Sequence, residues 1–506
     1  MLQKLRRFSF LGWVEKAGNK LPHPATLFAL MALLAILFSW VAALLDWKAI
    51  HPATNEVIHP FNLLSKDGIH RILEDMVTNF TSFAPLGIVL VAMLGIGIAE
   101  SSGLIGALIR LLVMKSPKRI ITFVLVLAGV LSNTASDIGY VLLIPLAGAI
   151  FHSFGRHPIA GMAAAFAGVS GGFSANLLLG TIDPLLAGLS TEAAHIIDAD
   201  YQVLPTANYY FMVISTIMIA GIGTWVTERM VVPRLGAYKG EVEAEAIQRL
   251  APNERRGLKF ALLFMAVFTG LILIGIIPEN GLLRPEDGNL LHSPVLHAII
   301  AFLFLGAGGM GVAYGFGCGA YKNDADVMNG MGDSLKGLAG YMVLVFFAAQ
   351  FVAYFKWSNL GVILAVQGAD VLATSQIGPI PLMILFILLA ASINMLMGSA
   401  SAKWAILAPV FIPMFMLLGY SPELSQAIYR IGDSVTNIVS PMMSFFALII
   451  AYFQKYDRGA GIGTIIATML PYSIAFFIGW TILLIIWFSL GIPLGPGAGL
   501  FYEMGN

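Results

Sequence analysis

Residues 380–418 read IPLMILFILLAASINML MGSASAK WAILAPVFIPMFMLL, two apolar arms joined by a short segment of small polar residues. A helix needs about 20 predominantly apolar residues to cross the hydrocarbon core of a bilayer, and each arm is shorter than this. Non-helical backbone at membrane depth is tolerated only where protein or a wet cavity satisfies its polar groups. The pattern predicts a helical hairpin that enters the membrane and turns back.

A second stretch, at 118–151, has the same plan. Residues 120–131 form an apolar arm of 12 residues, which is about 18 Å as a helix at about 1.5 Å per residue. The polar segment SNTASD at 132–137 precedes another apolar arm at 138–151. Neither arm spans a bilayer alone, so we interpret 118–151 and 380–418 as two re-entrant helical hairpins.

The composition excludes a water-soluble fold. Of the 506 residues, 58% are hydrophobic and 11% are charged, whereas about 25% are charged in an ordinary soluble domain. Lys and Arg number 28, as do Asp and Glu, so no net positive charge favours nucleic acid as a partner. The single cysteine, Cys318, excludes a cysteine-rich metal centre. We expect the lipid bilayer as a partner and no cofactor.

Nine further apolar stretches are long enough to cross a bilayer, which predicts an all-α polytopic membrane protein with nine transmembrane helices and two re-entrant hairpins in an inverted repeat. Their ranges are 21–45, 84–113, 158–180, 209–226, 258–277, 294–315, 338–354, 427–452 and 462–490. The first stretch is longer than a signal-peptide core and follows a basic N-terminal segment, so we interpret it as a retained helix.

The distribution of Lys and Arg orients these segments. With the N-terminus in the cytoplasm and both hairpins returning to the side from which they enter, most basic residues fall in cytoplasmic loops, as the positive-inside rule requires. The chain then divides into three parts. They are a first half at 1–235 with an inward-entering hairpin at 118–151, a cytoplasmic linker at 236–256, and a second half at 257–506 with an outward-entering hairpin at 380–418.

The same order of parts occurs in both halves. Each half has a broken hairpin, a short turn and then a helix interrupted by polar residues, at 168–176 and at 431–437. Because the two hairpins enter from opposite sides, the halves form an inverted repeat. Such repeats with discontinuous helices are typical of secondary transporters whose site lies near the middle of the membrane. We therefore predict a transporter and not an enzyme.

Ionisable residues within the apolar segments are candidate site residues. Each costs at least about 2.5–3.5 kcal/mol at the centre of a membrane helix unless it has a partner or water. Arg430, Asp433 and Asn437 are spaced i, i+3 and i+7, which places them on one helical face. One interpretation is an ion pair between Arg430 and Asp433. The other, which we favour, is that Asp433 and nearby carbonyl groups hold a cation while Arg430 faces an anionic solute.

Three more candidates lie next to turns. Lys403 and Trp404 follow the tip of the second hairpin, where the free amides of a restarting helix attract negative charge. Trp404 is either a ring that stacks on a flat solute or a packing aromatic, and Lys403 alternatively extends to the membrane surface. Asp183 precedes Pro184 at a helix end, which is typical of a solvated turn residue, and Asp137 is the other first-half acid.

Two other classes of protein are alternatives. Residues 168–172 (GVSGG) fit the nucleophile motif G-x-S-x-G, so one alternative is a polytopic membrane enzyme that uses Ser170 with an acidic partner. The sequence indicates neither the strand nor the histidine that this motif requires. A channel is the other alternative, and it predicts conductance that a competing aromatic solute does not saturate.

Four motifs resemble those of one family. They are SNTASD at 132–137, GGFSAN at 171–176, GSASAKWAILAP at 398–409 and RIGDS at 430–434. Together they resemble the AbgT family of p-aminobenzoyl-glutamate transporters, and the likeness extends over nearly the whole chain. The resemblance implies a homodimer in the bacterial inner membrane with nine transmembrane helices and two hairpins per subunit. It also implies transport of p-aminobenzoyl-glutamate or related folate-pathway aromatics, or export of sulfonamide antimetabolites.

The resemblance also implies site residues. The transport-site pattern of the family falls on Asp183, Ser401, Trp404, Pro422, Arg430, Asp433 and Pro441. The sodium region of the family falls on Asn394 and Asp433, and we add the polar residues of the two broken helices and the first tip as ion-binding candidates, namely Asn133, Asn176 and Asn437.

We expect a mobile unit, made of the hairpins and broken helices, that moves an aromatic carboxylate together with a cation. In this hypothesis Arg430 holds the carboxylate and Trp404 stacks on the ring. Asp433, with Asn394 and Asn437, binds the cation. Both Na⁺ and H⁺ fit as the coupling ion, and both uptake by symport and export by proton exchange fit the residues.

Overall fold

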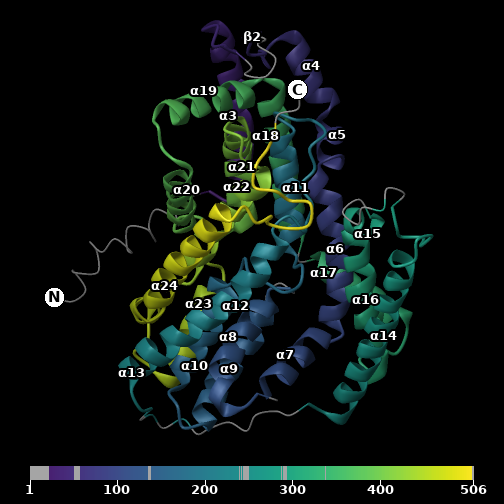
Figure 1. Cartoon of the computed structure of the whole chain (residues 1–506), viewed down its shortest axis with the longest axis vertical. Coiled ribbons are helices and arrows are strands. Elements are labelled where there is room, and N and C mark those ends of the chain that lie inside the picture. Colours follow the sequence, from purple (N-terminus) through teal and green to yellow (C-terminus); the bar gives the residue numbers. More distant parts are fainter. Residues whose placement is uncertain are drawn as a thin grey trace, which may run out of the picture.

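The computed structural model describes residues 22–50, 57–114, 116–134, 138–238, 240, 242, 250–285, 288, 293–336 and 338–503. Within these residues the protein is almost entirely helical, as predicted. Its strands are a short antiparallel pair, β1 (Ala49–Ile50) and β2 (Val57–Ile58). Many of the long helices follow the longest axis of the molecule (Figure 1).

Eight helical segments of the described residues are long and apolar enough to cross a membrane. They are α3 (Pro24–Leu44), α6 (Ala84–Ser101), Tyr209–Leu235 (α12 Tyr209–Val226, η5 Thr227–Val231 and α13 Val232–Leu235), α14 (Pro252–Ile276), α16 (Ile299–Cys318), α18 (Ala339–Trp357), α21 (Ala400–Leu417) and α24 (Ile462–Ser489). Because α21 belongs to the second predicted hairpin and two predicted crossings are interrupted, the count of nine crossings stays a prediction.

Shorter helices connect and complete these segments. They are α4 (Lys66–Glu74), α5 (Met76–Thr81), α7 (Leu104–Met114), η2 (Lys118–Ile120), α8 (Ile121–Ser132), η3 (Gly139–Leu143), α9 (Ile144–Ser153), α10 (Pro158–Phe166), η4 (Ala167–Gly171), α11 (Ile182–Ala194), α15 (Pro294–His297), α17 (Asp324–Lys336), α19 (Leu360–Thr374), α20 (Pro379–Asn394), α22 (Pro422–Asn437) and α23 (Phe446–Tyr456). Within the predicted linker at 236–256, residues 239, 241 and 243–249 lie outside the described residues, and α14 begins in this range, at Pro252.

Both predicted hairpins have two helical arms and an interruption between them. In the second, α20 ends at Asn394 and α21 begins at Ala400 after Ser399, whose hydroxyl accepts a hydrogen bond from the Ala402 amide. In the first, α8 ends at Ser132, and η3 and α9 form the returning arm. Residues 135–137, which include Asp137, lie outside the described residues. The side from which each hairpin enters a membrane stays a prediction.

The crossings at 158–180 and 427–452 are both interrupted, as predicted, but the break predicted at 431–437 is misplaced, because these residues are helical and the interruption follows them. The first ends in the π-helical turn η4, and residues 172–180 are non-helical before α11 begins. The second is α22, which ends at Asn437, and residues 438–445 separate it from α23. Before the first break, Gly168 lets η4 pack closely against α8, because a Cβ on Gly168 would lie 2.2 Å from the Val126 carbonyl oxygen. Small residues let these backbones approach each other.

The two predicted halves share one hydrophobic core. Helix α11 packs against α21 and α22, and α12 packs against α24. Trp480 on α24 is 1% exposed, and its indole N–H donates a 2.7 Å hydrogen bond to Ser215 Oγ on α12. Polar residues of one half are therefore held against helices of the other.

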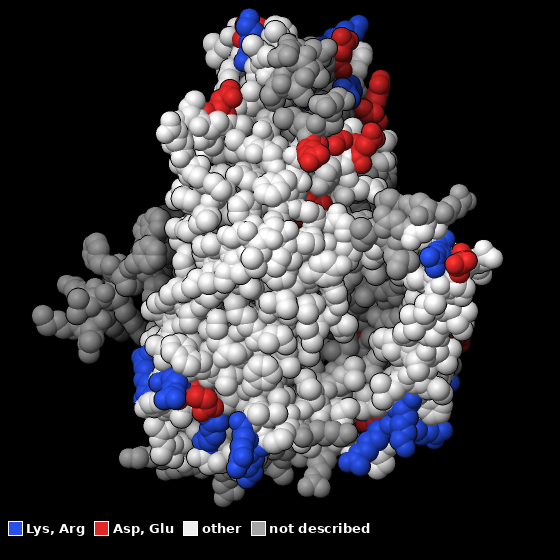
Figure 2. Space-filling view, in the orientation of Figure 1, with Lys and Arg blue, Asp and Glu red and all other residues white. Residues whose placement is uncertain are grey.

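The surface matches a lipid environment. Helix α14 exposes Leu262, Leu271 and Ile274, each more than 60% accessible. Charged side chains gather toward the two ends of the face seen in Figure 2, with an uncharged belt between them. Exposed apolar area on this scale is typical of a membrane-facing surface. The protein is a multi-pass membrane protein.

Gly432 allows the close contact between α20 and α22. A Cβ on Gly432 would lie 2.4 Å from the Ile387 carbonyl oxygen. We expect Gly432→Ala to destabilise the protein by about 1–3 kcal/mol, because overpacking forces the two helices apart. Thermal unfolding in detergent tests this, with Gly270→Ala on α14 as the control, since a Cβ there would meet nothing within 4 Å. Equal unfolding temperatures for the two variants would contradict this prediction.

Candidate functional site

Helix α22 carries a row of polar side chains through the interior. It begins after Ser421, whose hydroxyl accepts a hydrogen bond from the Leu424 amide, and Pro422 fills the first helical position. All of its residues except Thr436 are buried. Because burying an unpaired polar group is costly, the polar residues of α22 need partners from the neighbouring helices.

Arg430 forms its ion pair with Asp183 of the other half. Arg430 Nη2 lies 2.7 Å from Asp183 Oδ1, and the two side chains are 4% and 2% exposed. The second Asp183 oxygen accepts a 2.7 Å hydrogen bond from the Gly180 amide. The interpretation of Asp183 as a solvated turn residue is therefore wrong. The packing of α11 against α22 buries its side chain beside the Arg430 guanidinium. Arg430 Nε is buried without a hydrogen-bond partner among the described residues.

Asp433 forms its ion pair with Lys403 of the second hairpin. The Lys403 ammonium contacts both Asp433 Oδ1 and Asn394 Oδ1, and it is fully buried. The interpretation that Arg430 and Asp433 form an ion pair within α22 is therefore wrong, since each charge has a partner on another helix. The alternative that Lys403 extends to the membrane surface is also wrong. The ammonium lies where the predicted cation would contact Asp433 and Asn394.

Asn394 connects the second hairpin to α22. Its amide nitrogen donates to the Asp433 carbonyl oxygen at 2.7 Å, to Thr436 Oγ1 at 2.9 Å and to Asn437 Oδ1 at 2.8 Å. Of the predicted ion-binding residues, Asn394, Asp433 and Asn437 are thus brought together. Their oxygen atoms are of the kind that Na⁺ prefers.

Trp404 is packed on both its ring and its polar edge. Its ring stacks on Tyr429 of α22 with 4.5 Å between centroids and 25° between planes, and both residues are fully buried. Its indole N–H donates a 2.9 Å hydrogen bond to Ser190 Oγ on α11. In this conformation Trp404 acts as a packing aromatic that joins the hairpin to α11 and α22.

The first half approaches the same region through its broken helix. The Ser174 amide donates a 3.1 Å hydrogen bond to Ser434 Oγ of α22. Asn176 Nδ2 donates to Thr134 Oγ1 at 3.1 Å, at the tip of the first hairpin. Asn133 is 5% exposed, and neither polar atom of its side chain has a partner among the described residues. Asn133 and Asn176 therefore lie together, but the structure shows no contact between them and Asp433.

The remaining predicted residues lie around this centre. Ser401 is half-buried beside Ser399, 3.4 Å between hydroxyl oxygens, in the first turn of α21. Pro441 is half-buried in the break after α22. Pro422 is at the opposite end of α22 from Asp433, so these two residues do not share a single small cavity.

Sequence reasoning missed the polar partners that link α22 to α11. Ser190 Oγ donates to Gln426 Oε1 at 2.7 Å, and Gln426 Nε2 donates to Asn208 Oδ1 at 3.0 Å. A signal was present, because Glu423, Gln426 and Arg430 continue the three- and four-residue spacing of Asp433 and Asn437 toward the start of α22.

The serine of the enzyme alternative has no catalytic neighbours in the structure. Ser170 lies in η4, is fully buried, and its hydroxyl has no hydrogen-bond partner among the described residues. A nucleophile elbow requires a strand before the serine, but α10 precedes Ser170.

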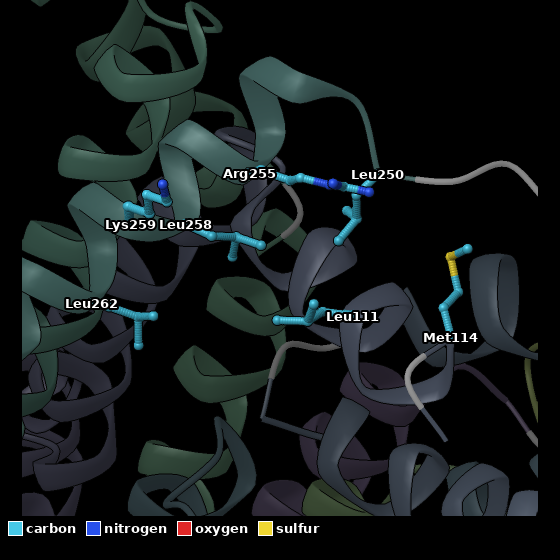
Figure 3. A pocket seen from close by; sticks show the side chains of 7 residues that line it. All are labelled: Leu111, Met114, Leu250, Arg255, Leu258, Lys259 and Leu262. Carbon is cyan, nitrogen blue, oxygen red and sulfur yellow. The ribbon is translucent and has the colours of Figure 1, made fainter. Parts of the chain in front are cut away.

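A surface pocket of about 470 Å³ lies between α7 and α14 (Figure 3). Its lining combines apolar residues with two cations and is made of Leu111, Met114, Leu250, Arg255, Leu258, Lys259 and Leu262. None of these residues belongs to the predicted site. The pocket therefore has no part in the buried network around α22.

In this protein, helix–break–helix segments meet at buried ion pairs inside a bundle of apolar helices. This arrangement defines a polytopic membrane transport protein. The model of the AbgT putative transporter family matches residues 9–502. The chain belongs to this family, as the motifs predicted, and it is a transporter and not an enzyme.

Known relatives cover nearly the whole chain. The p-aminobenzoyl-glutamate transport protein of Escherichia coli K12 is 37% identical over 487 residues, 96% of each chain. The crystal structure of the Alcanivorax borkumensis YdaH transporter matches with a TM-score of 0.90 and 47% identity, covering 94% of this chain and 100% of that one. Neisseria gonorrhoeae MtrF, described within a class of antimetabolite efflux pumps, matches with a TM-score of 0.92 and 50% identity, covering 97% and 100%.

Proposed function

We propose that the protein is a cation-coupled secondary active transporter of p-aminobenzoyl-glutamate or a related folate-pathway aromatic carboxylate. The observation that carries the proposal is the pair of buried ion pairs, Arg430 with Asp183 and Lys403 with Asp433, where α11, α21 and α22 meet. The similarity to the E. coli p-aminobenzoyl-glutamate transport protein supports this class of solute.

The charge of the site supports coupling to a cation. Its two cationic and two anionic side chains balance before a solute enters. An added carboxylate leaves excess negative charge in a region of low dielectric constant, where uncompensated charge is costly. Entry of Na⁺ or H⁺ with the solute removes this imbalance.

Arg430 is the proposed carboxylate-binding residue. The Arg430 guanidinium group is paired with Asp183 through Nη2, while its Nε is buried without a hydrogen-bond partner among the described residues. Guanidinium groups bind carboxylates through two parallel hydrogen bonds. A solute carboxylate can therefore bind Nε while Asp183 stays paired with the same guanidinium group. Ser401, Pro422 and Pro441 complete the proposed solute-binding set with Trp404 and Asp433.

Contact between Trp404 and the solute ring requires movement. Trp404 is fully buried between Tyr429 and Ser190. A solute ring reaches it only when the second hairpin separates from α11. This supports an elevator-like cycle in which the hairpins and broken helices move as a unit.

The proposed cation region contains Asn394, Asp433 and Asn437, with Asn133 and Asn176 as its first-half counterpart. Because the Lys403 ammonium contacts Asn394 and Asp433, Na⁺ at this position has to displace it.

Export of sulfonamide-type antimetabolites driven by protons is the second candidate function. The observation in its favour is the 50% identity to MtrF of the antimetabolite efflux class. Both candidates use the same buried ion pairs, and they differ in the direction of net movement.

The assembly and orientation are part of the proposal. We place a homodimer in the bacterial inner membrane with the N-terminus in the cytoplasm. Basic side chains gather at the lower end of the face in Figure 2, which the positive-inside rule assigns to the cytoplasm.

Proteoliposomes test the proposed function directly. We expect purified protein to accumulate labelled p-aminobenzoyl-glutamate when a Na⁺ or a proton gradient is imposed separately, and we expect unlabelled solute to compete. Because transport is coupled, one gradient should drive accumulation and collapse of that gradient should stop it. Flux that is indifferent to both gradients would contradict the coupling, and conductance without saturation would indicate a channel.

A further inference from the structure

The polar face of α22 extends well beyond the two ion pairs. Glu423, Gln426, Arg430, Asp433 and Asn437 follow one another at three- and four-residue spacing, so they lie along one face of the helix. Their span of 14 residues corresponds to about 21 Å at about 1.5 Å per residue. The proposed transport site uses the Arg430 to Asn437 part of this face, and the carboxyl group of Glu423 at its start has no role there.

Glu423 differs from the other two buried carboxylates of the network. It is 5% exposed, yet the described residues provide it with no Lys or Arg partner within ion-pair distance. Its Oε2 accepts a 2.8 Å hydrogen bond from the Tyr201 hydroxyl. Asp183 and Asp433 each lie within ion-pair distance of a cation, whereas the Glu423 carboxyl group has the Tyr201 hydroxyl as its partner, and burying a carboxylate without a cation is costly.

Several titratable groups surround Glu423. His195, Asp198 and Tyr201 come from the segment that follows α11, and Tyr502 comes from the C-terminal segment. The cations Arg430 and Lys403 lie further along the network. The Tyr502 hydroxyl donates to Asp198 Oδ2 at 3.2 Å, and the rings of Tyr201 and Tyr502 are 5.6 Å apart. His195 Nε2 lies 3.0 Å from the Tyr201 carbonyl oxygen. Asp198 is half-buried, so this end of the network approaches the surface.

Hydrogen bonds also connect Glu423 inward to the proposed site. Asn208 Nδ2 donates to the Glu423 carbonyl oxygen at 2.9 Å, and Asn208 Oδ1 accepts from Gln426. Gln426 in turn accepts from Ser190, which accepts from the Trp404 indole. These hydrogen bonds join the backbone of Glu423 to Trp404, the residue that links the second hairpin to α11.

From this arrangement we propose that Glu423 is the proton-binding carboxyl of the transport cycle. It takes up a proton from the aqueous end of the molecule where the C-terminal segment lies, when the anionic solute enters, and it returns the proton when the solute leaves. Protonation removes the negative charge of the Glu423 carboxylate, so it offsets one of the negative charges that the solute carboxylates bring. This inference rests on the proposed function and identifies its coupling ion as H⁺.

The test compares Glu423→Gln with the unmodified protein in proteoliposomes, with labelled p-aminobenzoyl-glutamate as the solute. Gln keeps the size of the side chain and an acceptor for Tyr201, so we expect assembly to survive. An imposed pH gradient should stimulate flux of the unmodified protein at least tenfold and flux of Glu423→Gln not at all. Solute exchange at equal pH should continue in both, because exchange needs no net proton movement.

Glu192→Gln is the matched control. Glu192 is on α11, two residues after Ser190 of the network, and its carboxylate accepts a 3.2 Å hydrogen bond from the Ala84 amide. We expect this variant to respond to the pH gradient as the unmodified protein does. If flux of Glu423→Gln responded fully to the pH gradient, the inference would be overturned while the proposed transport function would stand. Unmodified protein whose flux ignores the pH gradient would also overturn it, and unmodified protein without flux would overturn both proposals.

Tyr201→Phe provides a second, independent measurement. It removes the hydrogen bond to Glu423 and keeps the carboxyl group. Because the ionised Glu423 carboxylate loses a hydrogen-bond donor, the pH at which flux is half-maximal should move upward. Tyr502→Phe should move this pH less. A pH profile of Tyr201→Phe that coincides with that of the unmodified protein would overturn the inference.

Discussion

Replacing Arg430 with alanine is expected to reduce solute flux to background and to destabilise the protein by about 3–5 kcal/mol. The variant leaves the Asp183 carboxylate buried at 2% exposure without its cation. It also removes the guanidinium that would hold the solute carboxylate. Flux in proteoliposomes and thermal unfolding in detergent measure the two effects.

The double variant Arg430→Ala with Asp183→Asn separates binding from stability. Removing both charges relieves the unpaired carboxylate, so the unfolding temperature should recover most of its loss. Flux should stay at background because the carboxylate-binding group is still missing. Recovery of flux in the double variant would mean that Arg430 only neutralises Asp183, and normal flux in Arg430→Ala would refute the site assignment.

Replacing Lys403 with methionine is expected to abolish flux and to make the stability of the protein depend on Na⁺. The change leaves Asp433 buried beside Asn394 without the ammonium, at a cost of about 3–5 kcal/mol. Na⁺ can then occupy the position between these oxygen atoms, since oxygen ligands suit it. Added NaCl should raise the unfolding temperature of Lys403→Met more than that of the unmodified protein, with choline chloride as the salt control.

The double variant Lys403→Met with Asp433→Asn is the matched comparison for this effect. It lacks the carboxylate, so the specific response to Na⁺ should disappear while the unfolding temperature without added Na⁺ recovers. An equal response to Na⁺ in all three proteins would show that the cation acts elsewhere.

The interrupted architecture could be predicted because its causes are local. The segments SNTASD and MGSASAK place small polar residues between apolar arms, and the structure has helical arms on both sides of each. The interruptions predicted at 168–176 and 431–437 are also local signals, but the second is misplaced, because residues 431–437 continue α22 and the break comes at 438–445. The π turn at 167–171 and the non-helical residues 438–445 are held by contacts with other helices.

The polar residues inside the apolar segments can be identified from composition alone, and their spacing places Arg430, Asp433 and Asn437 on one face of a helix, because helical spacing is a local property. The pairing of Arg430 with Asp183 and of Lys403 with Asp433 depends on how the helices pack in the folded protein. An ion pair forms between whichever charges packing brings within a few ångströms, and α11, α21 and α22 are distant in the chain. For the same reason the isolation of Glu423 from any cation among the described residues is visible only in the folded protein.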